Sequence, residues 1–272
     1  PAALEAGEGP LAVIMPVHYL GLPCDMDRIL AVAQKKGAFV LEDCALAVDA
    51  TWGDQKAGTL GLAGSFSFYP VKHMTSIEGG MVTTNDPALA HELRRRRAFG
   101  YNRALGERTR PGLYDVDILG MNYRMSEVEA AVGLAQLTHL DDFMADRSRN
   151  DAALRAILTR IDGLTLFPDT HGKATSSHYC INAVLPRDGS VSRDRVVDGL
   201  NARKIGSSVH YPGPVPLFTY YSQKYGYKAG QFPVAEWLAD QTISLPVGPH
   251  LTRGDAERVG NAFQEAYSEA SR

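Results

Sequence analysis

The chain has 272 residues, 44% of them hydrophobic, so it can bury one large core or two smaller ones. Its formal net charge of -3 disfavours nucleic acid and anionic membranes as partners. The three cysteines, Cys24, Cys44 and Cys180, form no CxxC pair, which argues against a zinc knuckle or a disulfide framework. No apolar run reaches membrane-spanning length and no signal-peptide pattern is found, so we expect a cytoplasmic location.

The first predicted elements are a strand, a helix and a second strand. The continuous apolar run LAVIMPVH, residues 11–18, is typical of a buried strand. Residues 26–36 place apolar side chains at helical spacing, and Gly37 ends this helix. The next buried strand is AFVLED, residues 38–43. This order predicts a right-handed βαβ unit with parallel strands, whose ligands bind beyond the carboxyl ends of the strands, where Asp43 lies.

Lys72 lies in the stretch GSFSFYPVKHMTSIEGG, residues 64–80, on a loop between two predicted strands. Its near neighbours in the sequence are aromatic or apolar: Phe66, Phe68, Tyr69, Pro70, Val71 and Met74. Such surroundings should desolvate the amine, which lowers its pKa and increases the free base that attacks a carbonyl. A lysine at a strand end with its amine in water is the ordinary alternative.

Asp43 and Lys72 are more informative together than apart. Asp43 alone is equally compatible with a cap for the segment that follows. A pyridine-type cofactor that carries an aldehyde needs a lysine to hold it covalently and a carboxylate to keep its ring nitrogen protonated. Because both residues follow strands of one predicted sheet, the sequence indicates a site for such a cofactor.

Two longer segments carry a resemblance to a known family. They are EDCALAVDATWGDQKAGTLGLAGSFSFYPVKHMTSIEGGMVTTND, residues 42–86, and GMNYRMSEVEAAVGLAQL, residues 120–137. Both resemble the DegT/DnrJ/EryC1/StrS family of sugar aminotransferases, which depend on pyridoxal 5'-phosphate (PLP). The resemblance implies an α/β protein of the fold-type-I aminotransferase architecture and a homodimer with shared active sites. The large PLP-binding domain, a mostly parallel sheet flanked by helices, is expected over residues 1–162, and a smaller C-terminal α+β domain over residues 163–272.

The resemblance also assigns roles to residues. Lys72 would be the catalytic lysine that forms a Schiff base with PLP, and Asp43 would be the partner of the pyridinium nitrogen. Ala45 would pack under the cofactor ring. Ser67 would donate its hydroxyl to the phosphate, and Asn122 would reach the phosphate of the partner subunit, since hydroxyl and amide donors suit phosphate oxygens.

Three further residues are candidates for contact with the substrate. His210 and Tyr211 follow a predicted strand where relatives place substrate-facing residues, although packing is the more ordinary role for both. His73 stands where many relatives carry asparagine, and it is similar to the histidine of deoxysugar dehydratases in the same family. Those dehydratases replace the lysine itself, so the presence of Lys72 favours a transaminase. No metal site is expected.

The resemblance therefore implies an aminotransferase that moves an amino group from glutamate or glutamine to a keto-sugar, expected to be nucleotide-linked, or to a keto-cyclitol. Two departures keep alternatives open. Leu46 replaces the usual glutamine of the family, and the N-terminal segment that relatives carry before the first strand is expected to be missing. A PLP-dependent sugar dehydratase and a non-catalytic member of the family are the alternatives.

Overall fold

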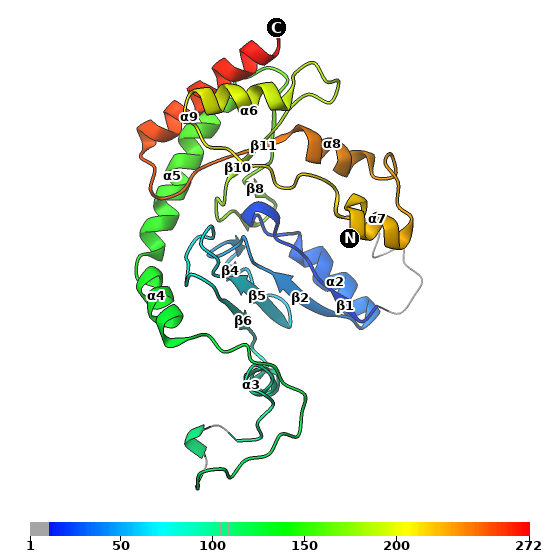
Figure 1. Ribbon diagram of the computed structural model, residues 1–272, viewed down its shortest axis with the longest axis vertical. Coiled ribbons are helices and arrows are strands. Elements are labelled where there is room, and N and C mark those ends of the chain that lie inside the picture. Colours follow the sequence, from blue (N-terminus) through cyan, green and yellow to red (C-terminus); the bar gives the residue numbers. More distant parts are fainter. Residues whose placement is uncertain (1–10, 104, 108) are drawn as a thin grey trace. The chain divides into compact units, whose positions relative to one another are not determined.

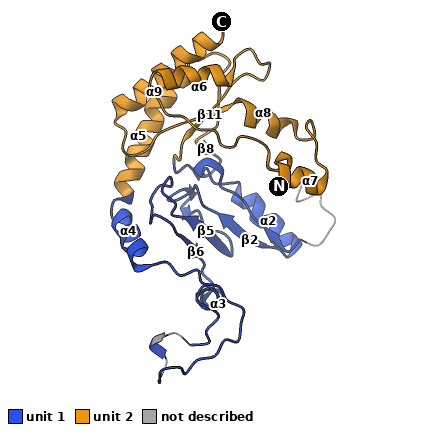
Figure 2. Cartoon of the chain, viewed as in Figure 1, with its two compact units in different colours: residues 1–140, 170–177 blue, residues 141–169, 178–272 orange. Residues whose placement is uncertain are grey.

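The computed structural model describes residues 11–103, 105–107 and 109–272 (Figure 1). These residues form two compact units (Figure 2). Unit 1 contains the chain up to Leu140 together with residues 170–177, and unit 2 contains residues 141–169 and 178–272. The domain boundary expected near residue 162 stays a prediction.

The main sheet of unit 1 has the strand order β1-β2-β5-β6. Strands β1, β2 and β5 are parallel, and β6 pairs with β5 in the antiparallel direction. The predicted strand–helix–strand order with parallel strands is thereby confirmed. The run of residues 11–18 forms only the two-residue strand β1, however, and Val13, Met15 and Val17 are exposed rather than buried. The elements of this part of the chain are β1 (Val13–Ile14), the 3-10 helix η1 (Tyr19–Gly21), α2 (Met26–Lys36), β2 (Phe39–Asp43), β5 (Ala63–Ser67), β6 (Gly80–Thr83) and α3 (Pro87–Arg96).

Helix α2 has the bounds that its sequence predicts. The Asp25 carboxylate accepts a hydrogen bond from the Arg28 N–H and caps the first turn. Gly37 ends the helix in the left-handed conformation, with φ of 66°. The apolar stripe of α2 packs on one face of the sheet, where Ile14 and Val40 are buried. This packing fixes the strands whose carboxyl ends carry the predicted site.

A second small sheet in unit 1 has the order β4-β3-β9-β8. Its strands are β3 (Thr51–Trp52), β4 (Gln55–Lys56), β8 (Thr170–His171) and β9 (Ala174–Thr175). Strands β8 and β9 form a hairpin that comes from far along the sequence, between segments that belong to unit 2. Trp52 is buried in the core of unit 1 together with Ala174.

The last segments of unit 1 are η2 (Leu105–Glu107) and α4 (Glu127–Leu137). Helix α4 begins with a capping box, in which Ser126 and Glu129 each bond the other's backbone N–H. Large side chains of α4 are exposed, among them Val128, Leu134 and Leu137.

Unit 2 combines a three-stranded antiparallel sheet, in the order β11-β10-β7, with helices. Helices α6 and α9 pack against each other, and the core includes Leu154, Ile181, Leu200, Ile243 and Phe263. The elements are α5 (Leu140–Leu158, begun in unit 1), β7 (Thr165–Leu166), β10 (Ile181–Val184), α6 (Arg193–Ala202), η3 (Val215–Leu217), α7 (Thr219–Tyr225), α8 (Pro233–Gln241), β11 (Thr242–Leu245) and α9 (Arg253–Ala270). Among the residues described, no helix combines the length and the apolar character that crossing a membrane requires.

Candidate active site

The predicted cofactor residues gather at one edge of the main sheet in unit 1. Asp43 is the last residue of β2, and Ser67 is the last residue of the neighbouring strand β5. The two strands are parallel and in register, with Asp43 opposite Ser65. Lys72 lies on the loop that connects β5 to β6, as predicted. Because the carboxyl ends of parallel strands meet at one edge, this geometry makes the edge a candidate ligand site.

The Lys72 loop, residues 68–79, is closed at its base by backbone hydrogen bonds. The Phe68 N–H donates to the Gly79 carbonyl at 2.9 Å, and the Phe68 carbonyl accepts from the Ser76 N–H at 2.9 Å. Within the loop, the Lys72 N–H donates to the Tyr69 carbonyl at 2.9 Å. Phe68 and Met74 are buried and anchor the loop. Lys72 itself is half-buried and is the last residue of the turn that begins at Tyr69.

Burial lowers the pKa of the Lys72 amine below its ordinary value of 10.5, because the charged form loses hydration. The carboxylate of Asp43 opposes this effect by attracting the ammonium, but it does not cancel it. The structure thus brings the two residues within electrostatic reach of each other. A partly desolvated lysine is the form that can act as a nucleophile and as a general base near neutral pH.

Asp43, Ala45 and Ser67 have well-defined local geometry. The Asp43 Oδ1 accepts a hydrogen bond from the Ala45 N–H at 3.0 Å, which fixes the carboxylate at the strand end. The small side chain of Ala45 is half-buried beside it. The Ser67 hydroxyl accepts weakly from the Tyr69 N–H at 3.4 Å and keeps its own proton for another acceptor.

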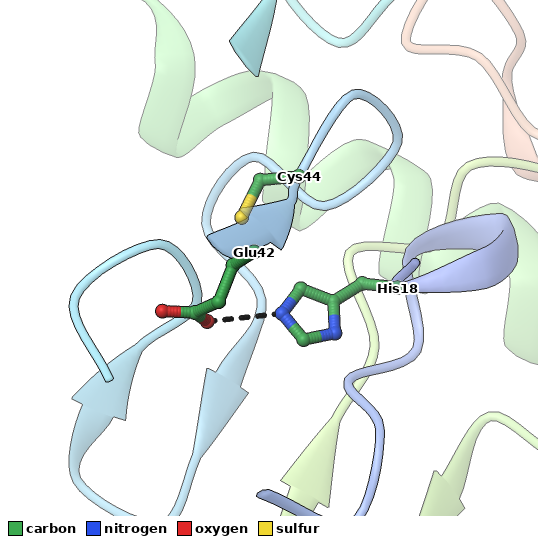
Figure 3. Close-up of side chains that lie close together, drawn as sticks. All are labelled: His18, Glu42 and Cys44. Atoms are coloured by element: carbon green, nitrogen blue, oxygen red, sulfur yellow. Dashed lines mark hydrogen bonds and ion pairs between the residues drawn. The ribbon is translucent and has the colours of Figure 1, made fainter. Parts of the chain in front are cut away.

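Near this edge the buried side chains of His18, Glu42 and Cys44 form a polar cluster, in which His18 and Glu42 are hydrogen-bonded (Figure 3). The Glu42 Oε2 accepts from His18 Nε2 at 3.0 Å and from the Gly58 N–H at 2.8 Å. The other oxygen, Oε1, accepts from the N–H groups of Leu60 and Gly61 at 2.8 and 2.7 Å. The Glu42 carboxylate therefore accepts four hydrogen bonds, about as many as its lone pairs allow.

The same bonds set the protonation of this network. His18 Nδ1 accepts from the Cys24 N–H at 3.1 Å, so the ring carries its proton on Nε2 and donates it to Glu42. Burial alone would raise the pKa of the Glu42 carboxyl, but the bonds from His18 and from three backbone N–H groups lower it below its ordinary value. His18, Glu42 and Cys44 have the spacing of metal ligands, yet the Glu42 oxygens are already engaged by donors. We interpret the cluster as a structural support for β2 rather than a metal centre.

The remaining predicted residues occupy different surroundings. His73 is only 2% exposed, and its Nε2 donates to the Ser177 carbonyl at 3.0 Å within unit 1. Asn122 is exposed, and its side-chain oxygen accepts from Arg124 Nε at 3.2 Å. His210 and Tyr211 belong to unit 2.

In unit 2, His210 is part of a hydrogen-bonded chain. The Ser244 hydroxyl donates to the Asn182 side-chain oxygen at 2.6 Å, so His210 Nδ1 must donate to the Ser244 oxygen, at 2.9 Å. The ring of Tyr179 lies edge-on to His210, and the exposed Tyr211 flanks it. This chain orients His210, which stays a candidate for substrate contact.

The sequence did not point to two residues near the site, Glu42 and Ser177. Glu42 was overlooked beside Asp43, although an acidic residue at a buried strand position signals that partners surround it. Ser177 gave no local signal, because its partners His73 and Leu46 are 104 and 131 positions away.

The residues at the sheet edge fit PLP. A partly desolvated lysine and a carboxylate fixed at the neighbouring strand end could serve as the covalent anchor and as the partner of the ring nitrogen. A small side chain adjoins the carboxylate, and a hydroxyl with a proton to donate ends the neighbouring strand. These are the groups that the aldehyde, the ring nitrogen, the ring face and the phosphate of PLP would each need.

Comparison with known proteins identifies the family of the chain. The family model of the DegT/DnrJ/EryC1/StrS aminotransferase family matches residues 5–264. The spore coat polysaccharide biosynthesis protein SpsC of Bacillus subtilis is 36% identical over 271 residues, covering 97% of this chain and 69% of SpsC. GDP-perosamine synthase of Caulobacter vibrioides is 37% identical over 256 residues, covering 93% of this chain and 65% of that enzyme.

Solved structures give the same result. DesV of Streptomyces venezuelae superposes with a TM-score of 0.86 at 33% identity, covering 99% of this chain and 68% of DesV. The expected fold class, an α/β protein of the aminotransferase type, is thereby confirmed. The chain spans about two thirds of the length of these relatives. It belongs to the DegT/DnrJ/EryC1/StrS family of sugar aminotransferases, enzymes that use PLP as their cofactor.

Proposed function

We propose that this aminotransferase transfers an amino group from glutamate or glutamine to a keto-sugar, nucleotide-linked in the favoured case, or to a keto-cyclitol. The observation that carries the proposal is the half-buried Lys72, whose pKa is lowered by burial while Asp43 acts on it from the neighbouring strand end. Relatives named as a GDP-perosamine synthase and as a dTDP-aminosugar transaminase support a sugar nucleotide as the acceptor.

Each residue at the sheet edge has a defined task in this proposal. Lys72 would hold PLP covalently, and Asp43 would keep the ring nitrogen protonated. Ala45 would leave room for the flat ring, and the hydroxyl of Ser67 would donate to the phosphate. When bound, PLP supplies an electron-withdrawing ring that takes up the electron pair left when a proton is removed from the amino donor.

Lys72 would also move the proton. With PLP and the amino donor bound, the Lys72 amine would remove the proton from the donor carbon that bears the amino group, hold it, and release it again as the amino group is transferred. A lowered pKa favours this role, because more of the amine is unprotonated at neutral pH. The apolar side chains of Phe68 and Met74 anchor the loop and keep the amine partly desolvated.

The proposal includes a homodimer, in which Asn122 contributes to the phosphate site of the other subunit. Asn122 is exposed in a segment of unit 1 that is rich in exposed apolar side chains. Leu119, Tyr123, Val128 and Leu134 are each more than half exposed there, and a patch of this kind marks a protein interface. The predicted setting of the enzyme is the cytoplasm.

The dehydratase alternative rests on His73 and on Leu46, and the surroundings of His73 do not favour it. The ring is buried and donates to the Ser177 carbonyl. A histidine held in this way serves the packing of the loop, whereas the lysine that an aminotransferase needs is present beside it. The aminotransferase is therefore the better supported function.

The test is spectroscopic. The purified chain is incubated with PLP, and its absorbance is recorded before and after borohydride reduction, for the wild type, for Lys72→Ala and for Lys35→Ala, which changes an exposed lysine in α2. We expect a band that borohydride fixes to the peptide containing Lys72 and that glutamate bleaches. A band that persists in Lys72→Ala would refute the assignment of the lysine. A band that neither glutamate nor glutamine changes would refute the transaminase activity.

A further inference from the structure

The hairpin formed by β8 and β9, residues 170–177, is bound to unit 1 at several points. Strand β9 pairs with β3, and the Gly53 N–H donates to the Lys173 carbonyl at 2.8 Å. Lys173 forms an ion pair with Asp27, whose carboxylate also accepts from Trp52 Nε1 at 2.9 Å. His171 Nε2 donates to the Pro23 carbonyl at 2.7 Å. These contacts fix the end of the hairpin, where Ser177 lies.

Ser177 connects three loops of the sheet edge. Its N–H donates to the Gly21 carbonyl at 3.0 Å, in the loop that follows β1. Its hydroxyl donates to the Leu46 carbonyl at 2.8 Å, in the loop that follows Asp43. Its carbonyl accepts from His73 Nε2 at 3.0 Å, in the Lys72 loop. Ser177 is fully buried, so these bonds form without competition from water.

Gly21 provides independent evidence that this junction is tightly built. A Cβ atom at Gly21 would lie 2.0 Å from the Ser177 hydroxyl oxygen and 2.6 Å from the Leu46 carbonyl oxygen. Gly21 also has φ of +86°, a conformation that other residues adopt only with strain. Only glycine therefore lets Ser177 approach both backbones at once.

His73 connects Ser177 to the Lys72 loop. It directly follows Lys72, and its ring is buried with the Nε2 proton committed to Ser177. The contact lies on the part of the loop that carries the lysine, while the backbone bonds of Phe68 close only the base. A loop tethered at its tip has fewer positions available to it than a loop held at its base alone.

We propose that Ser177 and His73 are positioning residues that hold the Lys72 loop against the loop of Asp43, so that the lysine is presented at a fixed place on the sheet edge. The proposal rests on the proposed role of Lys72 as the catalytic lysine. Neither residue is expected to touch substrate or cofactor. Both act through Lys72, since a small displacement of a reacting group lowers the rate of the chemical step strongly.

The test compares His73→Leu, which removes the donor, with His73→Gln, which places an N–H donor near the position of Nε2. Ser177→Ala removes the contacts of the hydroxyl with the Leu46 carbonyl at 2.8 Å and the Gly21 carbonyl at 3.4 Å, and leaves the backbone bonds of Ser177 in place. The apparent pKa of Lys72 is measured in the chain without cofactor, by competitive acylation over a pH series and mass spectrometry. Hydrogen exchange of the peptide spanning residues 69–79 is measured in the same samples. These readouts do not depend on transaminase activity.

We expect His73→Leu to raise the apparent pKa of Lys72 toward 10.5 and to accelerate exchange in the Lys72 loop. We expect kcat to fall by about tenfold while KM for the amino donor changes by less than about threefold, because binding groups are unchanged. His73→Gln should restore most of each value. Ser177→Ala should shift the same readouts in the same direction to a smaller extent.

An unchanged pKa of Lys72 and unchanged exchange in folded His73→Leu would overturn the proposal. So would a folded His73→Gln that behaves like His73→Leu, since the hydrogen bond would then not matter. If His73→Leu does not fold, Ser177→Ala decides the question with the same readouts. If the substitutions change the pKa of Lys72 and the exchange of its loop as expected but the wild-type chain does not transaminate, the proposed function is refuted and the positioning role stands.

Discussion

Glu42→Gln is the substitution whose effect can be worked out most fully from the structure. Four donors converge on the carboxylate, two on each oxygen: His18 Nε2 and the Gly58 N–H on one, and the Leu60 and Gly61 N–H groups on the other. A glutamine amide has only one oxygen, so its NH2 group must face one pair of donors. His18 cannot avoid facing the amide NH2 as a donor by moving its proton to Nδ1, because the Cys24 N–H already donates to that nitrogen.

Two buried donors are therefore left without an acceptor in either orientation of the amide. At about 1 to 3 kcal/mol for each buried donor, Glu42→Gln should lower the free energy of unfolding of unit 1 by about 2 to 6 kcal/mol. That is a large share of the roughly 5 to 15 kcal/mol that stabilises a typical domain.

Urea unfolding at pH 7, followed by the fluorescence of Trp52, measures this loss. Trp52 is 6% exposed in the core of unit 1, and Trp237→Phe removes the signal of the other tryptophan. The exposed Glu78→Gln in the same unit is the matched control and should change stability by less than about 0.5 kcal/mol. A loss below about 1 kcal/mol in Glu42→Gln would refute the four-donor account of this carboxylate.

Three other outcomes follow from the same structure. Because the folded pKa of Glu42 lies below its ordinary 4.5, the charge of this carboxylate stabilises unit 1 above pH 4.5. The difference in unfolding free energy between wild type and Glu42→Gln should therefore shrink as the pH falls through the folded pKa of Glu42. A constant difference down to acid unfolding would contradict this. Gly21→Ala should lower the free energy of unfolding by about 2 to 5 kcal/mol through overpacking and backbone strain. Gly37→Ala, which has open space around its Cβ, should lower it by only about 1 to 2 kcal/mol. Equal losses in urea unfolding would contradict the tight junction at Ser177. Phe263→Ala should destabilise unit 2, whose core encloses the ring completely, by about 3 to 5 kcal/mol in unfolding followed by Trp237, and a loss under about 1 kcal/mol would show that the ring is not part of a packed core.

Local signals in the sequence predicted much of unit 1. The apolar stripe of residues 26–36 and Gly37 act within a few residues of each other, and α2 has the predicted bounds. The two strands predicted around Lys72 are β5 and β6, and Lys72 lies on the loop between them. The neighbourhood of Asp43 and Lys72 also followed from the sequence, because the carboxyl ends of parallel strands in one sheet meet at the same edge.

What the sequence did not predict depends on contacts between distant segments. The donors to Glu42 come from backbone N–H groups of a loop, and backbone groups carry no residue type to recognise. Nothing near residues 170–177 indicates that this hairpin packs with β3, because the pairing is set by the tertiary structure. His73 was expected to contact substrate for the same reason, since its partner Ser177 lies more than 100 positions away.

The β8–β9 hairpin has a consequence for how the protein is made. Trp52 in β3 pairs with Ala174 in β9, so a ribosome must add about 120 residues after β3 before that pairing can form. At a synthesis rate of about 5 to 20 residues per second, the edge of β3 stays without β9 for roughly 6 to 24 s. During this interval the nascent chain presents an unpaired strand edge, which invites association with other chains. Unit 1 is thus completed late in synthesis, after much of the chain assigned to α3, α4 and α5 has already emerged.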